Sequence, residues 1–309
     1  MTGRELRNIT LSAIVLALAA LLPFLGNGYV LSIGITIAMF TVLATSWALF
    51  SGPTHYISLA TAAFYGLGTY VVAAGIDHLP YWLLLILALV AGAVAAALIG
   101  LATLRLSGVY FVIFTLGLAE MIRQIVSWAQ NNWGGHRGLY VLTDITEEIL
   151  YWELLAAATA VYLLGWWIGR SRLGFALRII GNDEVVAAHS GIDTARAKVM
   201  LFIVPGMVAS LVGALLAPRW TYIEPAIAFS AMLSFQVVIM ALLGGASRLW
   251  GPLLGVIPFT LLWEAISIYF PNQTMLLLGI VFLLIVFAIP RGIAGRAEDL
   301  LRAVRPRGN

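Results

Sequence analysis

The chain has 309 residues, of which 62% are hydrophobic and 10% are charged, and its mean hydropathy is +1.00. This composition excludes a water-soluble globule, because too few polar side chains are available to cover a surface. Cysteine is absent, which excludes disulfides and thiolate metal sites, and the four histidines show no paired spacing, so no metal site is expected. The chain is expected to lie in a lipid bilayer.

Long uncharged runs follow one another along the sequence. They are apolar on all sides instead of alternating, which predicts helices of about 20 residues and not the strands of a membrane barrel. The expected fold is an all-α membrane protein: one domain over residues 1–309, built as a polytopic bundle of about ten transmembrane or re-entrant helices. The ten spans are expected near residues 9–25, 29–50, 57–76, 80–104, 108–129, 150–169, 199–218, 229–246, 250–270 and 274–290.

The basic residues predict the orientation. If the N-terminus is cytoplasmic, 14 of the 17 lysines and arginines fall in cytoplasmic segments, Arg137 and Arg219 fall outside, and Arg123 lies within a span. Positive charge concentrates on the cytoplasmic side of membrane proteins, so both termini are expected there, with a loop at 170–198 and a basic tail at 291–309. This bias accounts for the isoelectric point near 9.3 without nucleic acid, and the tail is available to anionic lipid.

The segments expected outside are short. The longest of them, near residues 131–149 and 219–225, are too small to fold as a domain. Any domain that captures a substrate is therefore expected on another chain. Within the spans, Gly66, Gly68, Gly92 and Gly100 are interpreted as sites of close helix packing, since small residues let backbones approach in lipid.

A few ionisable or amide side chains lie inside the expected spans. Glu120 and Arg123 are three residues apart, on one face of a helix, where they can neutralise each other. Such groups usually face the interior of a bundle, so the pair is either a packing element or a polar station along a substrate path. Gln236 and Glu264 lie in two later spans. A proton-coupled carrier would use Glu264 or Glu120 as its relay.

The expected cytoplasmic loop contains signals for short helices. Asn182 is a suitable N-cap, and Asp183 and Glu184 place negative charge at the positive end of a helix dipole. Gly191 is a natural C-terminal stop, and Asp193 is the cap of the helix that follows. The pattern predicts a short, rigid helix in the cytosol, either an interfacial element or a docking site for another protein.

The sequence carries no motif for hydrolytic or nucleotide chemistry. The single lysine, Lys198, is not part of a Gly-Lys-Ser/Thr turn, and neither Gly-x-Ser-x-Gly nor His-Glu-x-x-His occurs. An enzyme is not expected. Energy for any pumping would come from a partner or from an ion gradient.

Several ordered segments match a known family. They are Ile57–Tyr70, Leu106–Glu120, the Gly134–Gly135 turn, Gly174–Arg178 leading to Asn182–Glu184 and Gly191–Ile192, then Leu243–Gly245, Trp250–Gly255 and Pro290–Gly292. Over roughly residues 40–295 the chain resembles the inner-membrane permease subunits of ATP-binding-cassette importers for branched-chain amino acids, in particular the LivM-type subunit.

The resemblance implies a coupling helix at 182–192 that docks on an ATPase subunit. The contacts it implies are Arg178, Asn182, Asp183, Glu184, Ala187, Ala188, Gly191 and Ile192. Gly181 and Asn182 depart from the family pattern, in which an Arg and a further Glu are usual.

The same resemblance implies an assembly in the bacterial inner membrane. Its other members would be a LivH-type second permease, two ATPase subunits that bind ATP and Mg, and a periplasmic binding protein; this chain would hold no cofactor. Importers of urea, short amides or aromatic acids share the architecture, so the cargo stays open. An autonomous proton-coupled carrier and a channel-like pore are the alternatives.

Overall fold

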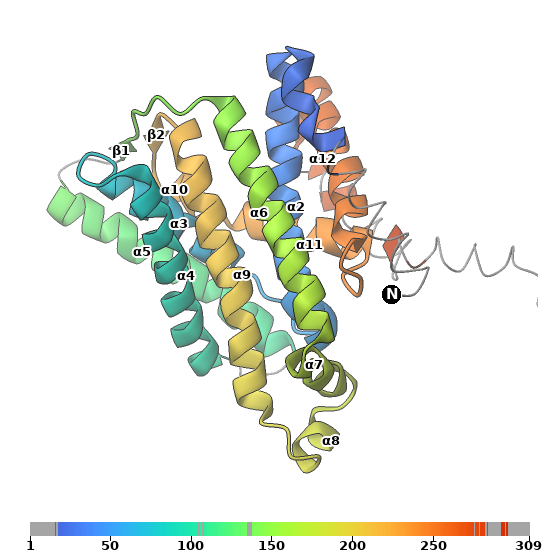
Figure 1. The fold of residues 1–309 in the computed structure, drawn as a ribbon. Coiled ribbons are helices and arrows are strands. Elements are labelled where there is room, and N and C mark those ends of the chain that lie inside the picture. Colours follow the sequence, from blue (N-terminus) through green and yellow to red (C-terminus); the bar gives the residue numbers. More distant parts are fainter. Residues whose placement is uncertain are drawn as a thin grey trace, which may run out of the picture.

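A computed structural model describes residues 18–103, 108–134 and 138–274, together with 16, 106, 276–277, 279–281, 283, 292–293 and 295. The long helices pack together, most of them along one direction and α5 obliquely to the others (Figure 1). They are α2 (Gly28–Thr54), α3 (Thr61–Gly75), α4 (Tyr81–Thr103), α5 (Val109–Ala129), α6 (Glu147–Arg170), α9 (Thr194–Leu216), α11 (Ala231–Gly244) and α12 (Gly251–Tyr269). Shorter elements connect them: η1 (Leu22–Leu25), η2 (Gln130–Gly134), α7 (Arg172–Asn182), α8 (Glu184–His189), η3 (Ala217–Arg219), α10 (Pro225–Ala228), η4 (Pro271–Gln273) and the paired strands β1 (Leu139–Tyr140) and β2 (Tyr222–Ile223).

Within the described residues, seven helical segments are long and apolar enough to cross a membrane. They are α2, α4, α5 with η2, α6, α9 with η3, α10 with α11, and α12. A polytopic helical membrane protein is thereby confirmed. The expected spans at 9–25 and 274–290 lie partly outside the described residues, so the count of about ten stays a prediction.

Helix α9 forms the centre of one half of the bundle, where α3 and α4 approach it closely. A Cβ atom on Gly68 of α3 would overlap the Ser210 carbonyl of α9, and one on Gly92 of α4 would overlap Ser210 as well. The hydroxyl of Ser210 donates to the carbonyl of Ala88 at 2.7 Å. The prediction that Gly68 and Gly92 serve close packing is confirmed, and these contacts replace the hydrophobic drive that lipid does not supply.

The expected span at 57–76 is not one continuous helix. Helix α2 ends at His55, which has φ +58°, and α3 begins only at Thr61. The residues between them form neither helix nor strand, and Ser58, Leu59 and Ala60 are buried; this stretch is here called the extended segment. Non-helical backbone at membrane depth is tolerated only where protein or water satisfies its polar groups, and here neighbouring side chains do so.

Three polar side chains hold this extended segment. Ser234 of α11 accepts a hydrogen bond from Ala62 N at 2.8 Å and donates to Leu59 O at 2.9 Å. Thr115 of α5 accepts from Leu59 N at 3.1 Å, and the indole of Trp47 donates to Ser58 O at 2.8 Å. The sequence could not indicate these bonds, because their partners come from distant helices.

Replacing Ser234 by Ala is expected to lower the free energy of unfolding by about 1–3 kcal/mol, since it leaves two buried backbone groups unpaired. Ser46→Ala is the matched control, because Ser46 is equally buried but donates only to Leu43 O in its own helix. Thermal unfolding of the purified protein in detergent measures both. Equal midpoints for the two variants would contradict the role given to Ser234.

Candidate functional site

Helices α7 and α8 form a projection at one end of the bundle (Figure 1). Helix α6 ends at Arg170, α7 turns beneath the bundle, and α8 extends past the ends of α6 and α9. Ser171 starts α7 by accepting a hydrogen bond from Gly174 N at 3.2 Å. The sequence had not separated α7 from α8, although Ser171 and the buried positions Leu177 and Ile180 have helical spacing.

The cap of α8 is Asp183 and not Asn182, so that expectation was wrong. Asp183 Oδ1 accepts from Val185 N at 2.8 Å and from Val186 N at 3.2 Å. Asn182 is the last residue of α7. The other signals are confirmed: Gly191 follows α8 with φ +80°, and Asp193 Oδ1 accepts from Arg196 N at 3.0 Å.

The residues expected to contact an ATPase point in different directions. Arg178, Asn182, Asp183, Ala188 and Gly191 are exposed. Ala187 is buried, and Glu184 and Ile192 are half-buried against the bundle. Two apolar residues that sequence reasoning missed, Val185 and Val186, are exposed on α8. The sequence could have indicated this exposure, since two adjacent valines on a six-residue water-side helix cannot both face the core.

Glu184 attaches α8 to the bundle instead of facing outward. Its Oε1 accepts from Lys198 Nζ at 2.6 Å, and its Oε2 accepts from the Tyr56 hydroxyl at 3.1 Å. Lys198 Nζ also lies 3.2 Å from that hydroxyl and 4.8 Å from the centre of the Tyr56 ring. The Lys198 side chain is 3% exposed and the Glu184 side chain 39%. These three residues, here called the strut, join α8 to α9 and to the extended segment.

The Glu184 carboxylate of the strut is ionised near neutral pH. Burial alone would raise the pKa of Glu184, but the hydrogen bond and charge of Lys198 and the hydrogen bonds of Tyr56 and Thr194 outweigh it and hold that pKa below its usual value. The ionised carboxylate therefore contributes stability above its unfolded pKa, and this contribution is lost only as the pH falls through the lowered folded pKa.

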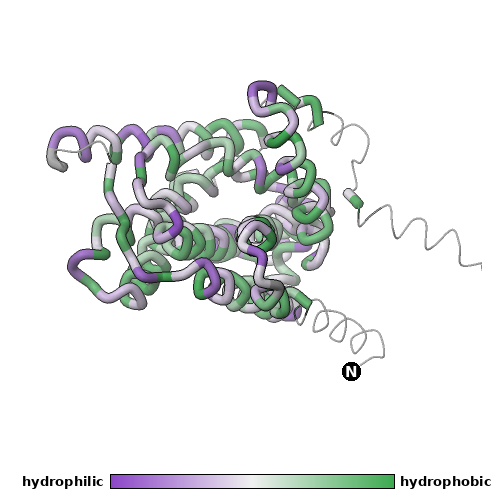
Figure 2. Tube along the Cα trace, turned by 90° about the horizontal axis from the view of Figure 1, so that it is seen from above, coloured by the Kyte–Doolittle hydropathy of each residue, from purple (hydrophilic) through white to green (hydrophobic). Residues whose placement is uncertain are grey.

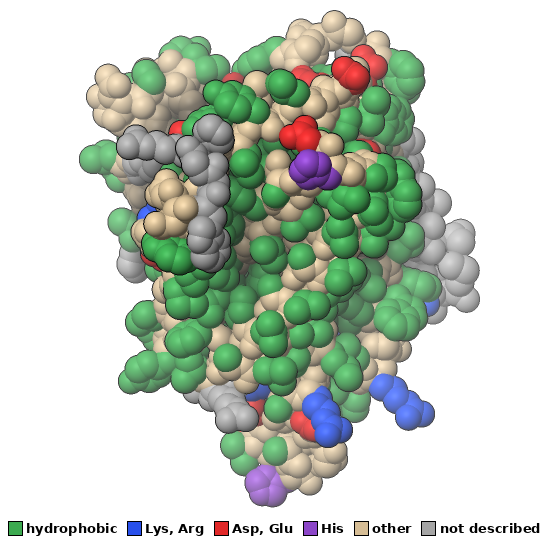
Figure 3. Space-filling view, turned by 90° about the vertical axis from the view of Figure 1, so that its left-hand side faces the viewer, with side chains coloured by type: hydrophobic (Ala, Val, Ile, Leu, Met, Phe, Trp, Pro, Cys, Tyr) green, Lys and Arg blue, Asp and Glu red, His purple; other side chains and the backbone are tan. Residues whose placement is uncertain are grey.

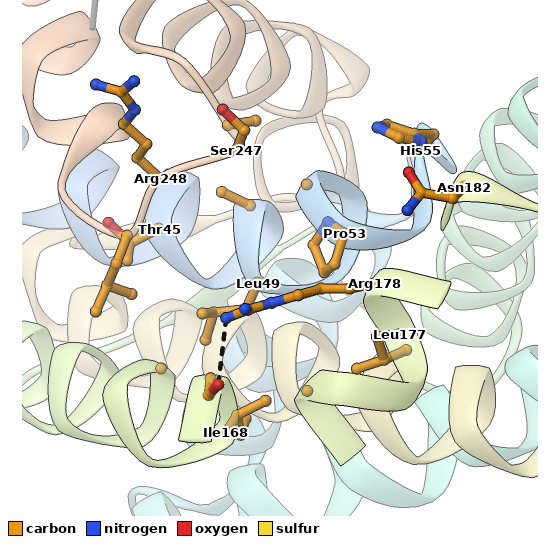
Figure 4. Close-up of a pocket in the computed structure, with 17 residues that line it drawn as sticks. Thr45, Leu49, Pro53, His55, Ile168, Leu177, Arg178, Asn182, Ser247 and Arg248 are labelled. Atoms are coloured by element: carbon orange, nitrogen blue, oxygen red, sulfur yellow. Dashed lines mark hydrogen bonds between the residues drawn. The ribbon is translucent and has the colours of Figure 1, made fainter. Parts of the chain in front are cut away.

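A cavity of about 460 Å³ opens beside α7 (Figure 4). Arg178 lies across it and donates to Gly169 O at 3.3 Å, while Arg248 lies on its opposite side. His55 and Asn182 lie together at its edge. Its lining residues include no carboxylate.

Helix α7 is fixed there by backbone contacts. His55 Nδ1 lies 2.9 Å from Gly181 O, and a Cβ on Gly181 would overlap the Pro53 carbonyl. A side chain at position 181 therefore has no room beside α2. The cavity thus lies beside α7, and the strut attaches the adjoining helix α8.

The four intramembrane candidates do not form one site. Arg123 Nε donates to Glu120 Oε2 at 2.8 Å on α5, and Glu264 of α12 accepts from the Tyr29 hydroxyl at 3.1 Å. Gln236 is buried in α11. In the described part of the chain, no hydrogen bond joins the α5 pair to Gln236 or Glu264. Nor do its histidines and acidic residues gather into a metal-binding group.

Comparison with known proteins decides the family. The family described as the branched-chain amino acid transport system / permease component matches residues 29–288. The chain belongs to this family. The match runs from the first turn of α2 beyond α12 and therefore includes both the projection and the extended segment.

The permease is similar to both kinds of subunit named in this family. It is 24% identical to the high-affinity branched-chain amino acid transport system permease protein LivM of Escherichia coli K12, over 93% of this chain and 75% of the relative. It is 24% identical to LivH of the same organism, over 86% of this chain and 94% of the relative. The probable LivM permease of Methanocaldococcus jannaschii is 25% identical, over 68% of this chain and 67% of the relative. No solved structure matches the chain.

Proposed function

We propose that this permease is a transmembrane subunit of an ATP-binding-cassette importer for branched-chain amino acids, driven through α8 by separate ATPase subunits. The observation that carries the proposal is the projection: a capped helix at the end of the bundle, attached by an ion pair whose lysine is buried. Family membership supports the same role. The ATPase chains would bind the ATP and Mg, and this chain would hold neither.

The charges support an orientation with the projection in the cytosol of a bacterial inner membrane. The end with α7 and α8 carries Lys and Arg side chains, whereas the opposite end carries mainly Asp and Glu, with an apolar band between them (Figure 3). Cytoplasmic segments of membrane proteins are enriched in basic residues. Both termini would then be cytoplasmic, and a periplasmic binding protein would deliver the solute to the end formed by β1 and β2.

The partner permease would be a LivH-type chain. Relatives named LivM and LivH occur in the same organism, and this chain is similar to both. The bundle would pass the solute, and the binding protein would select it. Urea, short amides and aromatic acids therefore remain alternative cargoes of the same architecture.

The test is a pair of substitutions on the exposed side of α8. Val185→Asp combined with Val186→Asp is expected to weaken ATPase association about 30-fold, since losing a docking anchor costs about 2 kcal/mol. Ala195→Asp on the exposed first turn of α9 is the control for added charge. Co-purification of ATPase subunits and ATP-driven leucine uptake measure the effect. Normal association of the double variant would overturn the docking role.

The alternative, a proton-coupled carrier, makes the opposite prediction. It requires Glu264 or Glu120 as relay, so Glu264→Gln or Glu120→Gln would stop uptake driven by a pH gradient in liposomes holding this chain alone. The proposed importer shows no such uptake. A channel-like pore would let the solute run down its own concentration gradient, without ATP and without coupling to an ion gradient.

A further inference from the structure

Helix α5 is the least buried of the candidate spans in the described residues. Seen from above, it lies along one edge of the bundle (Figure 2). Its side toward the bundle is formed by Phe111, Thr115 and Ala119, which are buried. Val112, Leu116, Leu118, Ile122 and Val126 are half-buried and also pack against the bundle, and most of the remaining side chains of α5 are exposed.

That outer surface carries two stripes, together with the exposed Val109 and Ile113 near the start of the helix. The apolar stripe is exposed and repeats at helical spacing; it consists of Tyr110, Phe114, Met121, Ile125 and Trp128. The polar stripe alternates steps of three and four residues, which places it on one adjacent face; it consists of Gly117, Glu120, Gln124, Ser127 and Asn131. A helix that faced only lipid would carry the first stripe and not the second.

The polar stripe carries charge near the middle of the span. Glu120 is central in the segment Val109–Asn132. The side chains of Glu120 and Arg123 are 48% and 29% exposed. Glu120 accepts hydrogen bonds from Arg123 and, at 2.9 Å, from Gln124, both on its own helix. Ionised groups at this depth face protein or water and not hydrocarbon.

The exposure also decides against a packing role within this chain. A pair that locked helices together would lie between them, as Lys198 does with 3% exposure at the other end of the bundle. No other element in the described part of the chain covers Glu120, whose side chain is left 48% exposed, so we assign its cover to another chain. The similarity to both LivM and LivH of one organism supplies the candidate, a second permease of the same family.

We infer that the polar stripe of α5 lines a water-filled path whose opposite wall is a second permease chain, and that Glu120, Arg123 and Gln124 contact the solute there. This inference rests on the proposed function and adds the surface that the solute meets. The opposite charges of Glu120 and Arg123 cancel, so the stripe attracts neither cations nor anions. Its carboxylate and guanidinium suit a zwitterion, whose ammonium and carboxylate groups also cancel.

Cysteine substitution tests whether the polar stripe lines a water-filled path, because the chain contains no cysteine of its own that would react. Single cysteines at positions 117, 124 and 127 are compared with single cysteines at 114, 121 and 125 in the assembled transporter. The polar stripe positions are expected to react with a charged, water-soluble methanethiosulfonate at least tenfold faster than the apolar ones. Leucine should slow that reaction, and the modification should block uptake. Ser127→Cys is nearly isosteric, so it gives a readout even if another variant fails to fold.

Charge substitution tests the chemistry. Glu120→Gln or Arg123→Gln alone leaves one net charge and is expected to lower leucine uptake more than tenfold. The double variant restores neutrality but lacks both charged contacts, so its uptake should exceed that of either single variant and stay below that of the wild type, whereas a proton relay at Glu120 would stay inactive. No recovery would overturn the charge-matching part of the inference.

The outcomes separate this inference from the proposed function. ATP-dependent uptake with an unreactive polar stripe overturns the inference and leaves the importer role intact. A reactive stripe with uptake that ignores ATP overturns the importer role and leaves the path on α5. Equal reactivity of both stripes, with no effect on uptake, also overturns the inference.

Discussion

Replacing Glu184 by Gln is expected to destabilise the permease by about 2 kcal/mol, and to lower ATP-driven uptake about tenfold or more. The substitution leaves the Lys198 ammonium, 3% exposed, without its carboxylate. The expected loss of stability is smaller than the 3–5 kcal/mol typical of breaking a fully buried ion pair, because water reaches Glu184, which is 39% exposed. Thermal unfolding in detergent and uptake in liposomes measure the two effects.

The double variant Glu184→Gln with Lys198→Met is the decisive partner of that experiment. It removes the buried charge together with its carboxylate, so it should be more stable than Glu184→Gln alone. If the strut transmits force, uptake by the double variant should stay low while its stability recovers. Recovery of both would assign the strut a purely structural role. Tyr56→Phe removes only hydroxyl contacts and should give a smaller loss.

The strut should also be insensitive to mild acid. Because the folded pKa of Glu184 lies below its usual value, the carboxylate stays ionised between pH 8 and about pH 5. Uptake should show no titration from this group in that interval, whereas a carboxylate relay working near neutral pH would produce one. The pH dependence of uptake by Glu184→Gln should therefore run parallel to that of the wild type in this interval.

Replacing Gly68 by Leu is expected to prevent the permease from folding. A side chain there meets the Ser210 carbonyl of α9, which is backbone and cannot move aside. Overpacking of a tight core costs about 1–3 kcal/mol, and more where backbone must shift. The yield of monodisperse protein from membranes is the measurement, and Gly68→Ala should show a smaller deficit.

Gly117→Leu is the matched control for that variant. Gly117 also lies within a span, but a Cβ there meets nothing within 4 Å. This variant should fold normally in detergent. If both leucine variants fold equally well, the α3–α9 contact does not have the tight packing described.

Sequence reasoning predicted the helices. It failed where contacts between distant parts of the chain determine the local conformation. Charge-free runs predicted α2, α4, α5, α6, α9 and α12 within a few residues, because hydrophobic length alone sets a span. Asp193 was predicted as a cap because capping is local.

Between Asn182 and Asp183, local signals were equal. The length of α7 decided, and that length depends on packing against α2. The interval Ile57–Thr61 contains neither Gly nor Pro, so nothing local marks it as extended. Its conformation is imposed by Ser234, Thr115 and Trp47.

In the candidate site, too, local features were predictable and features set by distant contacts were not. That α8 is a short capped helix was predictable, whereas the inward direction of Glu184 was not. Glu184 meets Lys198 fourteen residues later and Tyr56 more than a hundred residues earlier. The Glu120–Arg123 pair was found from its spacing, yet its exposure on the outer side of α5 required the arrangement of the whole bundle.

The bonds of Ser234 constrain the order in which the permease can be made. Its partners Ala62 and Leu59 precede it by 172 and 175 residues. During synthesis, the Ala62 amide and the Leu59 carbonyl lack their native hydrogen-bond partner until α11 leaves the ribosome. The N-terminal half therefore cannot reach its final form in the bilayer first. Until then, the insertion machinery or retained water must shelter residues 57–62.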